Sequence, residues 1–300
     1  MKEIALCCIM GAAGDHLALG AYLGPAGLNT LYQLADSALK VDDFDKMFGQ
    51  KCLMGSFEDR QMLDADDLSV IKELELKYRG HNQWPVFRSY EPGYYPWFLE
   101  AHQCRFLTYI FQQGLDVCLR KRRNQVDFGD PSHNHFLIRR PHIDKNSINW
   151  TDEYQKIDPE PTNYCSFKIV DELMLKRLRS LKIQPGLVLE ADVFYFPTPI
   201  KEKGRPYFPL VSLLIEEEQG IILGNEMFQD IKTEGYKCLD MLINQIQNIQ
   251  KLPAKLLVSQ DRSFFLYQDV CEQLGIKLEQ SDDLPVMEEV RKSMAEFLDQ

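Results

Sequence analysis

The hydrophobic pattern in the last third of the chain predicts one continuous α/β unit. Apolar runs rich in β-branched and aromatic residues predict five strands, at 187–196, 209–216, 220–227, 256–258 and 276–280. Apolar residues with helical spacing predict three helices, at 236–250, 264–274 and 285–298. The elements therefore follow the order strand, strand, strand, helix, strand, helix, strand, helix.

That order of elements is typical of the ribonuclease H-like fold, a mixed sheet whose first three strands are antiparallel and whose faces are covered by helices. We therefore predict an α/β (α+β) protein whose ribonuclease H-like domain occupies residues 184–300. The boundary is expected at Gln184-Pro185-Gly186, since Pro and Gly interrupt regular structure. A fold alone does not define an activity.

The first part of the chain, residues 1–183, is expected to form an α+β domain of unknown function. Apolar runs at 3–10 and 16–23, joined by a glycine-containing turn, predict a hairpin. Further strands are predicted at 51–57, 136–140, 149–157 and 166–170, and helices at 26–38, 68–78, 99–122 and 171–181. Because Gly11 and Gly14 precede a strand rather than a helix, they do not match a phosphate-binding loop.

Charge is distributed unevenly between the two predicted domains. Residues 184–300 contain 11 Lys and Arg against 20 Asp and Glu, a net charge of −9, whereas residues 1–183 carry −2. Phosphate contacts need positive surface, so the acidic balance argues against a nucleic-acid partner unless the first half supplies it. Basic clusters do occur there, at Arg120-Lys121-Arg122-Arg123, Arg139-Arg140 and Lys176-Arg177. Solvated surface is the alternative interpretation of these clusters.

Cysteine usage and hydropathy indicate a cytoplasmic protein. The eight cysteines form no Cys-x-x-Cys pair, which favours free thiols in a reducing compartment. No apolar stretch approaches 18 residues, so no transmembrane helix is expected. Gly11 and Asp15 interrupt the first apolar run, which we interpret as a strand rather than a signal peptide.

Residues 84–98 combine three prolines with seven aromatic residues. Such a segment either forms a rigid arch that fills a core or presents aromatic side chains to a protein or ligand. The arch is the favoured interpretation. If the segment instead binds a partner, the contact residues are expected to be Trp84, Tyr90, Tyr94, Tyr95 and Trp97.

The only histidine cluster is a candidate for a metal site. On a strand, His133 and His135 would point to one face, and His142 or Asp144 could supply a third ligand. Pro131 and Pro141 make both ends of the segment loop-like. Histidines at a surface turn are the favoured interpretation, and metal analysis distinguishes the two.

A nuclease of the ribonuclease H-like fold holds two divalent ions between acidic side chains. It needs one acid on the first strand and others from the first helix, the end of the fourth strand and the last helix. The matching acids are Asp192, Asp240, Asp261 and Glu288. Asp192 is the best candidate, because an ionised carboxylate in mid-strand is costly unless it is paired or metal-bound.

The remaining acids also fit structural roles. Asp261 can cap the following helix, and Glu288 lies where the helix dipole favours an acid. Arg262 could neutralise part of the site, and Phe194 is bulky where the strand face should be open. A magnesium or manganese cofactor is therefore expected only if the nuclease interpretation holds; otherwise none is.

Several segments resemble a bacterial family of uncharacterised proteins known only as domains of unknown function. The resemblance rests on segments spread over nearly the whole chain: Ile9-Met10-Gly11, Gly20-Ala21-Tyr22-Leu23-Gly24, Phe57-Glu58-Asp59-Arg60, Tyr90-Glu91-Pro92-Gly93-Tyr94-Tyr95-Pro96-Trp97, Glu190-Ala191-Asp192-Val193-Phe194 and Arg205-Pro206-Tyr207-Phe208-Pro209. It implies a grouping and no substrate. Three functions therefore stay open: a non-catalytic binding protein, which we favour, a metal-dependent nuclease, and a metal-binding enzyme or sensor.

Overall fold

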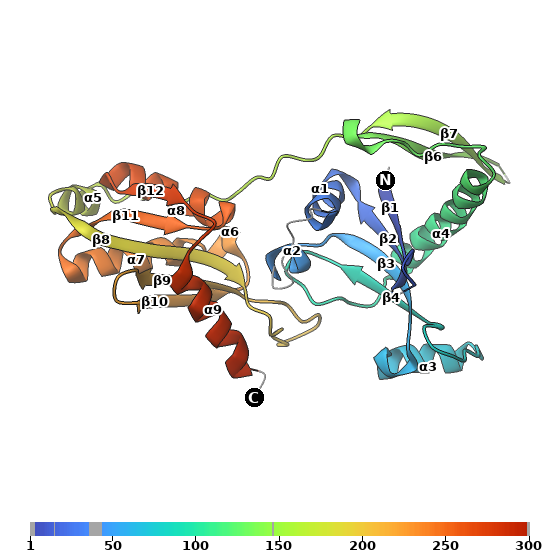
Figure 1. Cartoon of the computed structure of the whole chain (residues 1–300), viewed down its shortest axis with the longest axis horizontal. Helices are drawn as coiled ribbons and strands as arrows, with labels where there is room; N and C mark the ends of the chain where they lie inside the picture. Colours follow the sequence, from blue (N-terminus) through green and yellow to red (C-terminus); the bar gives the residue numbers. More distant parts are fainter. Residues whose placement is uncertain (1–3, 15, 36–43, 146, 299–300) are drawn as a thin grey trace. The chain divides into compact units, whose positions relative to one another are not determined.

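The chain divides into two compact units. A computed structural model describes residues 4–14, 16–35, 44–145 and 147–298 (Figure 1). The first unit comprises Met1–Pro92 and Pro96–Pro161, and the second comprises Gly93–Tyr95 and Thr162–Gln300. The short segment Gly93–Tyr95 thus belongs to the second unit, although the residues before and after it in the sequence belong to the first.

The first unit is built around a four-stranded antiparallel sheet. Its strands follow the sequence order: β1 (Ala5–Met10), β2 (Leu17–Leu23), β3 (Cys52–Glu58) and β4 (Trp84–Tyr90). Side chains alternate between the two faces of such strands. Leu19 and Leu53 pack against α4 (Ala101–Arg122) on one face. Tyr22 and Cys52 pack on the other face, where α1 (Gly24–Ala35) contributes Leu28.

A second, three-stranded sheet completes the first unit. It consists of β5 (Gly129–Asp130), β6 (His135–Asp144) and β7 (Ser147–Lys156), with β6 and β7 forming a long antiparallel ribbon. Phe136 and Ile138 of β6 pack onto the core that contains α1. The remaining elements of this unit are α2 (Phe44–Phe48), η1 (Arg60–Met62), α3 (Ala65–Glu73) and η2 (Pro131–His133).

The second unit contains a five-stranded mixed sheet in the order β10-β9-β8-β11-β12. The strands are β8 (Ile183–Tyr195), β9 (Leu210–Glu216), β10 (Ile221–Phe228), β11 (Leu252–Val258) and β12 (Lys277–Gln280). The first three pair antiparallel, and β11 and β12 run parallel to β8. Numbered within the unit, the order is 3-2-1-4-5, which is the topology of the ribonuclease H-like fold. The predicted fold class is confirmed.

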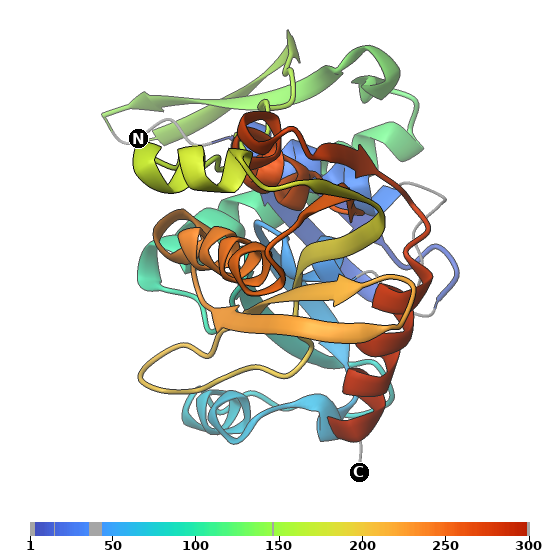
Figure 2. The same cartoon turned by 90° about the vertical axis from the view of Figure 1, so that its left-hand side faces the viewer.

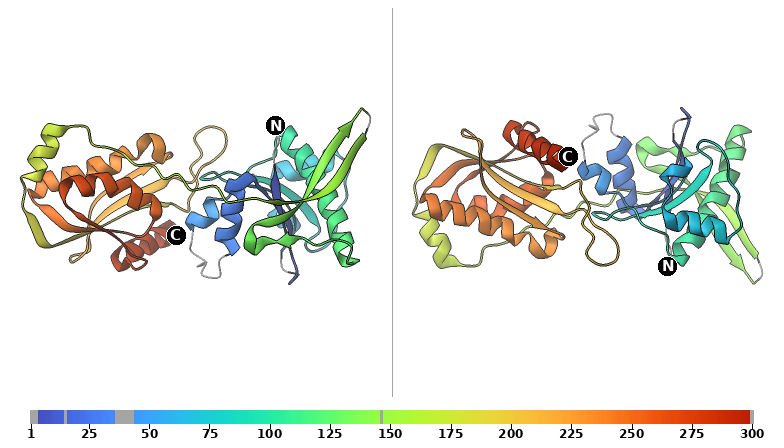
Figure 3. Two further views of the ribbon diagram at one scale, coloured as in Figure 1. Left: turned by 90° about the horizontal axis from the view of Figure 1, so that it is seen from above. Right: turned by 90° about the horizontal axis from the view of Figure 1, so that it is seen from below.

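Helices cover both faces of this sheet. The larger core contains buried residues of α5 (Glu172–Arg179), α7 (Tyr236–Ile249) and α8 (Asp261–Leu274). The smaller core joins α9 (Pro285–Leu298) to the opposite face, where Phe194, Val211 and Leu213 are buried. Figure 3 shows α9, in dark red, across the sheet from α7. The short helix α6 (Ile231–Glu234) precedes α7.

The boundary between the units lies earlier in the chain than the one expected at 183/184. Gln184-Pro185-Gly186 is part of strand β8. Leu175 and Leu178 of α5 belong to the same core as Leu189 of β8, so the segment before β8 folds with the second unit.

Within the described ranges, no helix has both the length and the apolar composition that a bilayer crossing needs.

Two segments of the first 183 residues also differ from expectation. Residues 166–170 form no strand; Phe167 and Ile169 instead pack onto the larger core of the second unit. Their alternation therefore reports the burial of every second side chain, not pairing in a sheet. In the aromatic segment 84–98, the first seven residues form β4, where Pro85 is tolerated because β4 is an edge strand.

Candidate functional site

Asp192 lies in the middle of β8, the central strand of the second sheet, and is completely buried. Its neighbours Ala191 and Val193 are equally buried and belong to the larger core. Because side chains alternate along a strand, Asp192 shares its face with Glu190 and Phe194, the face that α9 covers. The sequence therefore places a carboxylate where an apolar side chain would be expected.

Hydrogen-bond donors surround the Asp192 carboxylate. Ser263 Oγ donates to Oδ1 at 2.5 Å, and the Gln260 backbone N–H lies 3.3 Å from the same oxygen. Ser259 Oγ donates to Oδ2. These three groups come from the end of β11 and the start of α8. Buried carboxylates are stable when their oxygens are hydrogen-bonded in this way.

Arg291 of α9 provides the opposite charge. Its Nη2 lies 3.1 Å from Asp192 Oδ2, and its guanidinium carbon lies 4.0 Å from the centre of the Phe194 ring. The ring face attracts a cation and shields it from water, which strengthens the ion pair. Phe194, which is bulky for the open strand face of a nuclease, therefore packs against the Arg291 guanidinium and helps to hold it beside Asp192.

This donor set does not fit a pair of divalent ions. At the end of the fourth strand stands Ser259, and Arg291 projects from the last helix, where a nuclease requires acids. A guanidinium beside the carboxylate repels a metal cation, and neutral serine hydroxyls are weak ligands by comparison with carboxylates. Across residues 4–14, 16–35, 44–145 and 147–298, no group of three His, Cys, Asp or Glu side chains is arranged to hold a metal ion.

The other predicted acids are engaged elsewhere. Asp261 is exposed and accepts hydrogen bonds from Tyr164 Oη at 3.0 Å and Gln280 Nε2 at 2.8 Å. Glu288 is exposed in the first turn of α9. Neither carboxylate is among the partners of the Asp192 carboxylate, which are two hydroxyls, two backbone amides and a guanidinium.

A second buried acid, Glu190, was not singled out from the sequence. It is fully buried, and its Oε2 accepts a hydrogen bond of 2.8 Å from the Met287 backbone N–H at the start of α9. Its Oε1 has no hydrogen-bond partner among the described residues. Burial raises the pKa of Glu190 above its ordinary value. The signal that could have found it is the two-residue spacing from Asp192 on a predicted strand.

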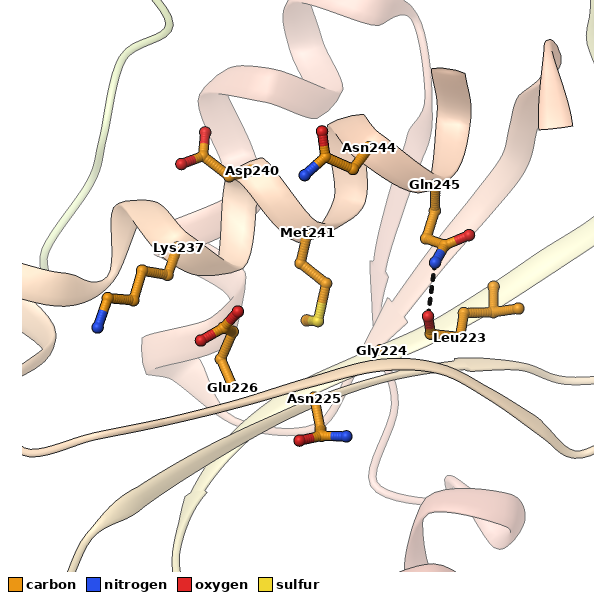
Figure 4. Close-up of a pocket in the computed structure, with 9 residues that line it drawn as sticks. All are labelled: Leu223, Gly224, Asn225, Glu226, Lys237, Asp240, Met241, Asn244 and Gln245. Atoms are coloured by element: carbon orange, nitrogen blue, oxygen red, sulfur yellow. Dashed lines mark hydrogen bonds between the residues drawn. The ribbon is translucent and has the colours of Figure 1, made fainter. Parts of the chain in front are cut away.

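Asp240, the last of the predicted acids, lines a small pocket between α7 and the edge strand β10 (Figure 4). The pocket has a volume of about 300 Å³. Lys237, beside it, is paired with Glu234 at 2.7 Å. Figure 4 shows the Asp240 carboxylate on the side of α7 away from the strand and the Asn244 amide extending along the helix, so the polar groups do not converge on one point.

The histidine cluster lies at an exposed turn and on the β6–β7 ribbon. His133 Nδ1 contacts Asp130 Oδ2 at 2.6 Å and Ser132 Oγ at 3.1 Å. A catalytic triad needs the serine and the carboxylate at different imidazole nitrogens, whereas here both face Nδ1. His142 Nε2 contacts Thr151 Oγ1 at 2.9 Å, and His135 is exposed on β6.

The basic clusters of the first unit are largely ion-paired. Arg120 and Arg139 share Asp152, at 2.6 and 2.5 Å. Lys121 pairs with Asp127, and Arg140 pairs with Glu153 at 2.5 Å. Positive charge neutralised in this way contributes less to phosphate binding than free lysine or arginine.

The aromatic segment is divided between the two units. Trp84 and Tyr90 are half-buried on β4, and Trp97 forms a backbone bridge with Ser89. Tyr94 and Tyr95 belong to the second unit, where the Tyr95 N–H bonds Pro206 O at 2.9 Å and the Gln229 amide donates to Tyr94 Oη. Within each unit the backbone of the segment is anchored and its rings are partly exposed, and contact of these rings with a partner stays a prediction.

Each half of the chain matches a family of unknown function. Residues 1–139 match the model described as Domain of unknown function (DUF7309), and residues 174–295 match Domain of unknown function (DUF6930). The resemblance to domains of unknown function is confirmed to this extent. Among curated proteins, none matches the sequence.

Solved structures similar to the chain include retroviral integrase catalytic cores. The HTLV-2 integrase catalytic core domain in complex with magnesium, in trimeric and dimeric forms, is 14% identical over 36% of this chain and 66% of that chain, with a TM-score of 0.27. The BIV integrase catalytic core domain is 13% identical over 37% of this chain and 65% of that chain, with a TM-score of 0.25. The chain thus spans just under two thirds of the integrase chains it matches.

Proposed function

We propose that this protein is a non-catalytic binding protein whose second unit uses a ribonuclease H-like fold as a scaffold. The observation that carries the proposal is the environment of Asp192. Its carboxylate is completely buried and bound by Ser259, Ser263 and Arg291. Held in this way, the Asp192 carboxylate links β8 to α8 and α9, and its ion pair with Arg291 stabilises the fold.

Catalysis by two metal ions would require this arrangement to be dismantled. The ions would have to displace Arg291 and find further carboxylates, yet Asp261 is bonded to Tyr164 and Gln280. Each metal ion needs several oxygen ligands, of which negatively charged ones are the most effective. The local chemistry therefore favours an arginine-occupied site over a metal-occupied one.

The second candidate is a divalent-metal-dependent nuclease. It is favoured by the strand order of the second sheet and by the position of Asp192 on the first strand of that sheet. It requires Arg291 to leave the carboxylate when metal and substrate bind. The third candidate, a metal site on the cluster of His133, His135 and His142, requires ligands that turn toward one ion.

One experiment separates these candidates. The purified protein is incubated with labelled single-stranded DNA, double-stranded DNA and RNA in Mg²⁺ or Mn²⁺, beside the variants D192N and D240N. We expect no hydrolysis by any of the three proteins and no bound metal by elemental analysis. Hydrolysis that is lost in D192N and kept in D240N, the matched acid on an exposed helix face, would overturn the proposal in favour of the nuclease.

We further propose a cytoplasmic location. All eight cysteines are free, although three of them, Cys52, Cys238 and Cys271, are buried in the cores. Burial raises the pKa of each of these thiols, to about 12, about 11 and about 12, so they stay protonated and unreactive. Free thiols of this kind persist in a reducing compartment. Fractionation of the native cells tests the location.

A further inference from the structure

A groove in the second unit lies between α9 and the turn that joins β9 to β10. Its volume is about 860 Å³. Figure 2 shows α9 running past the end of this hairpin. The groove lies on the sheet face that α9 only partly covers, so the edge strand β10 forms its far side. It is separate from Asp192, whose carboxylate is buried beneath α9.

The floor of the groove is apolar. Val286, Val290 and Met294 follow one another at four-residue spacing, so they form a stripe along one face of α9. Ile222 of β10 faces them and keeps 46% of its surface exposed. Further along the same face of β10, Met227 is 50% exposed. Apolar side chains gathered in this way mark a binding surface more often than scattered ones do.

The rim of the groove is acidic. Glu217 and Glu218 lie in the β9–β10 turn, and Glu289 lies on α9. None of these three carboxylates forms an ion pair with any residue that the structure describes, and no Lys or Arg lines the groove. The Glu216 carboxylate accepts hydrogen bonds from the backbone N–H groups of Glu218 and Gln219, which fixes the turn and the rim acids on it.

From this combination we infer that the groove binds an amphipathic helix of a partner protein, one that carries Lys and Arg beside an apolar stripe. The inference rests on the proposed binding function and names the class of partner. An apolar stripe on α9 at helical spacing is complementary to the stripe of a second helix packed along it. The unpaired acids supply the charge that selects basic flanking residues.

Two other occupants fit less well. An added β-strand would need an uninterrupted edge, but β10 contains an irregularity between Ile222 and Gly224, and the Leu223 carbonyl there accepts a 2.5 Å hydrogen bond from Gln245. A second copy of this chain, docked symmetrically, would place acidic rim against acidic rim. A basic helix avoids both difficulties.

The test uses synthetic peptides and the full chain. The probe is a fluorescein-labelled 18-residue peptide of Leu and Lys, with Leu placed at helical i, i+3, i+4, i+7 spacing. A scrambled peptide has the same composition and charge but no apolar face, and a third peptide replaces every Lys with Glu. Fluorescence anisotropy reports binding, and circular dichroism of each variant checks that it is folded.

Matched variants locate the binding surface. E217Q/E218Q/E289Q removes the rim charges, and E202Q/D240N/E272Q removes three exposed acids elsewhere in the unit. I222S changes the groove floor, and I221S changes the neighbouring, equally exposed isoleucine outside it. We expect the Leu-Lys peptide to bind, and the groove variants E217Q/E218Q/E289Q and I222S to weaken it by about tenfold or more, while the two controls change it by less than about threefold.

The inference is overturned if the scrambled peptide binds equally well, if the Glu peptide binds, if groove and control variants behave alike, or if no peptide binds. Each of these results leaves the nuclease assay untouched, since that assay reports only on Asp192. Failure of the helix-binding groove and failure of the non-catalytic proposal are therefore distinguishable.

Discussion

Two arginine–aspartate networks, one in each unit, have the same chemistry but different surroundings. In the first unit, Arg120 and Arg139 converge on Asp152, whose side chain keeps 33% of its surface exposed. In the second unit, Arg291 reaches Asp192, whose side chain is fully buried. Exposed ion pairs contribute little to stability, whereas removing one partner of a buried pair leaves an uncompensated charge in the protein interior.

The comparison shows why burial, rather than the presence of an acid, decides what Asp192 does. A carboxylate at the surface is free to exchange its partner for water or a metal ion. The oxygens of the Asp192 carboxylate are occupied by two serine hydroxyls, two backbone amides and a guanidinium. The second unit thus contains a buried acid whose oxygens are occupied, and three acids without an ion-pair partner among the described residues, Glu217, Glu218 and Glu289, that lie at the groove beside α9.

The largest expected effect comes from D192N. The asparagine leaves the Arg291 charge without its partner and places an amide NH₂ against the serine hydroxyls. We expect the free energy of unfolding to fall by about 3 kcal/mol, the lower end for a buried pair because Arg291 is partly exposed. Urea denaturation followed by circular dichroism measures it.

The control for that prediction is the double variant D192N/R291M, which removes both charges. Because no unpaired charge remains, we expect it to be more stable than D192N alone. A double variant less stable than D192N would mean that Arg291 stabilises α9 independently of Asp192.

A smaller effect is expected from D152N in the first unit. Asp152 serves two arginines, but all three side chains are partly exposed, so we expect a loss of about 0.5–1 kcal/mol. The same urea titration measures it. A loss as large as that of D192N would contradict the distinction between the two networks.

The salt dependence of the two stability effects tests the same difference between exposed and buried ion pairs. Ions screen exposed charges more than buried ones, so raising NaCl from 0.05 to 0.5 M should reduce the D152N effect and leave the D192N effect nearly unchanged. Equal salt dependence of the two variants would indicate that water reaches Asp192.

The smallest expected effect is a pH trend at Glu190. Burial raises the pKa of this carboxyl in the folded protein, while the Met287 N–H offsets part of that cost. The folded state therefore binds more protons than the unfolded state as the pH rises from about 4.5, and stability falls through that window. E190Q does not titrate, so its stability relative to the wild type should increase from pH 4 to pH 7. A constant or decreasing difference would show that Glu190 is not desolvated.

The strands and helices of the second unit could be predicted from the sequence more completely than the contacts made by Asp192. Strand β8 and helix α9 follow from local periodicity, and Asp192 was recognisable as a carboxylate in mid-strand. Its partners were not recognisable, because Ser259 and Arg291 lie 67 and 99 residues further along the chain. Periodicity reports which face a residue occupies, but not which distant side chain will meet it.

The unit boundary illustrates a different limit. Pro185 and Gly186 signal an interruption, yet they lie within β8. What decides the boundary is tertiary packing: Leu175 and Leu178 contact the core of the second unit. Local turn signals do not contain that information.

The most direct test of the account is isothermal titration of Mn²⁺ into the wild-type protein and D192N, with D240N as the matched control. The central claim is that arginine and serine, not metal, satisfy the Asp192 carboxylate. It predicts no saturable Mn²⁺ binding that depends on Asp192, and identical titrations for the three proteins. Saturable binding to the wild type and D240N that disappears in D192N would contradict it.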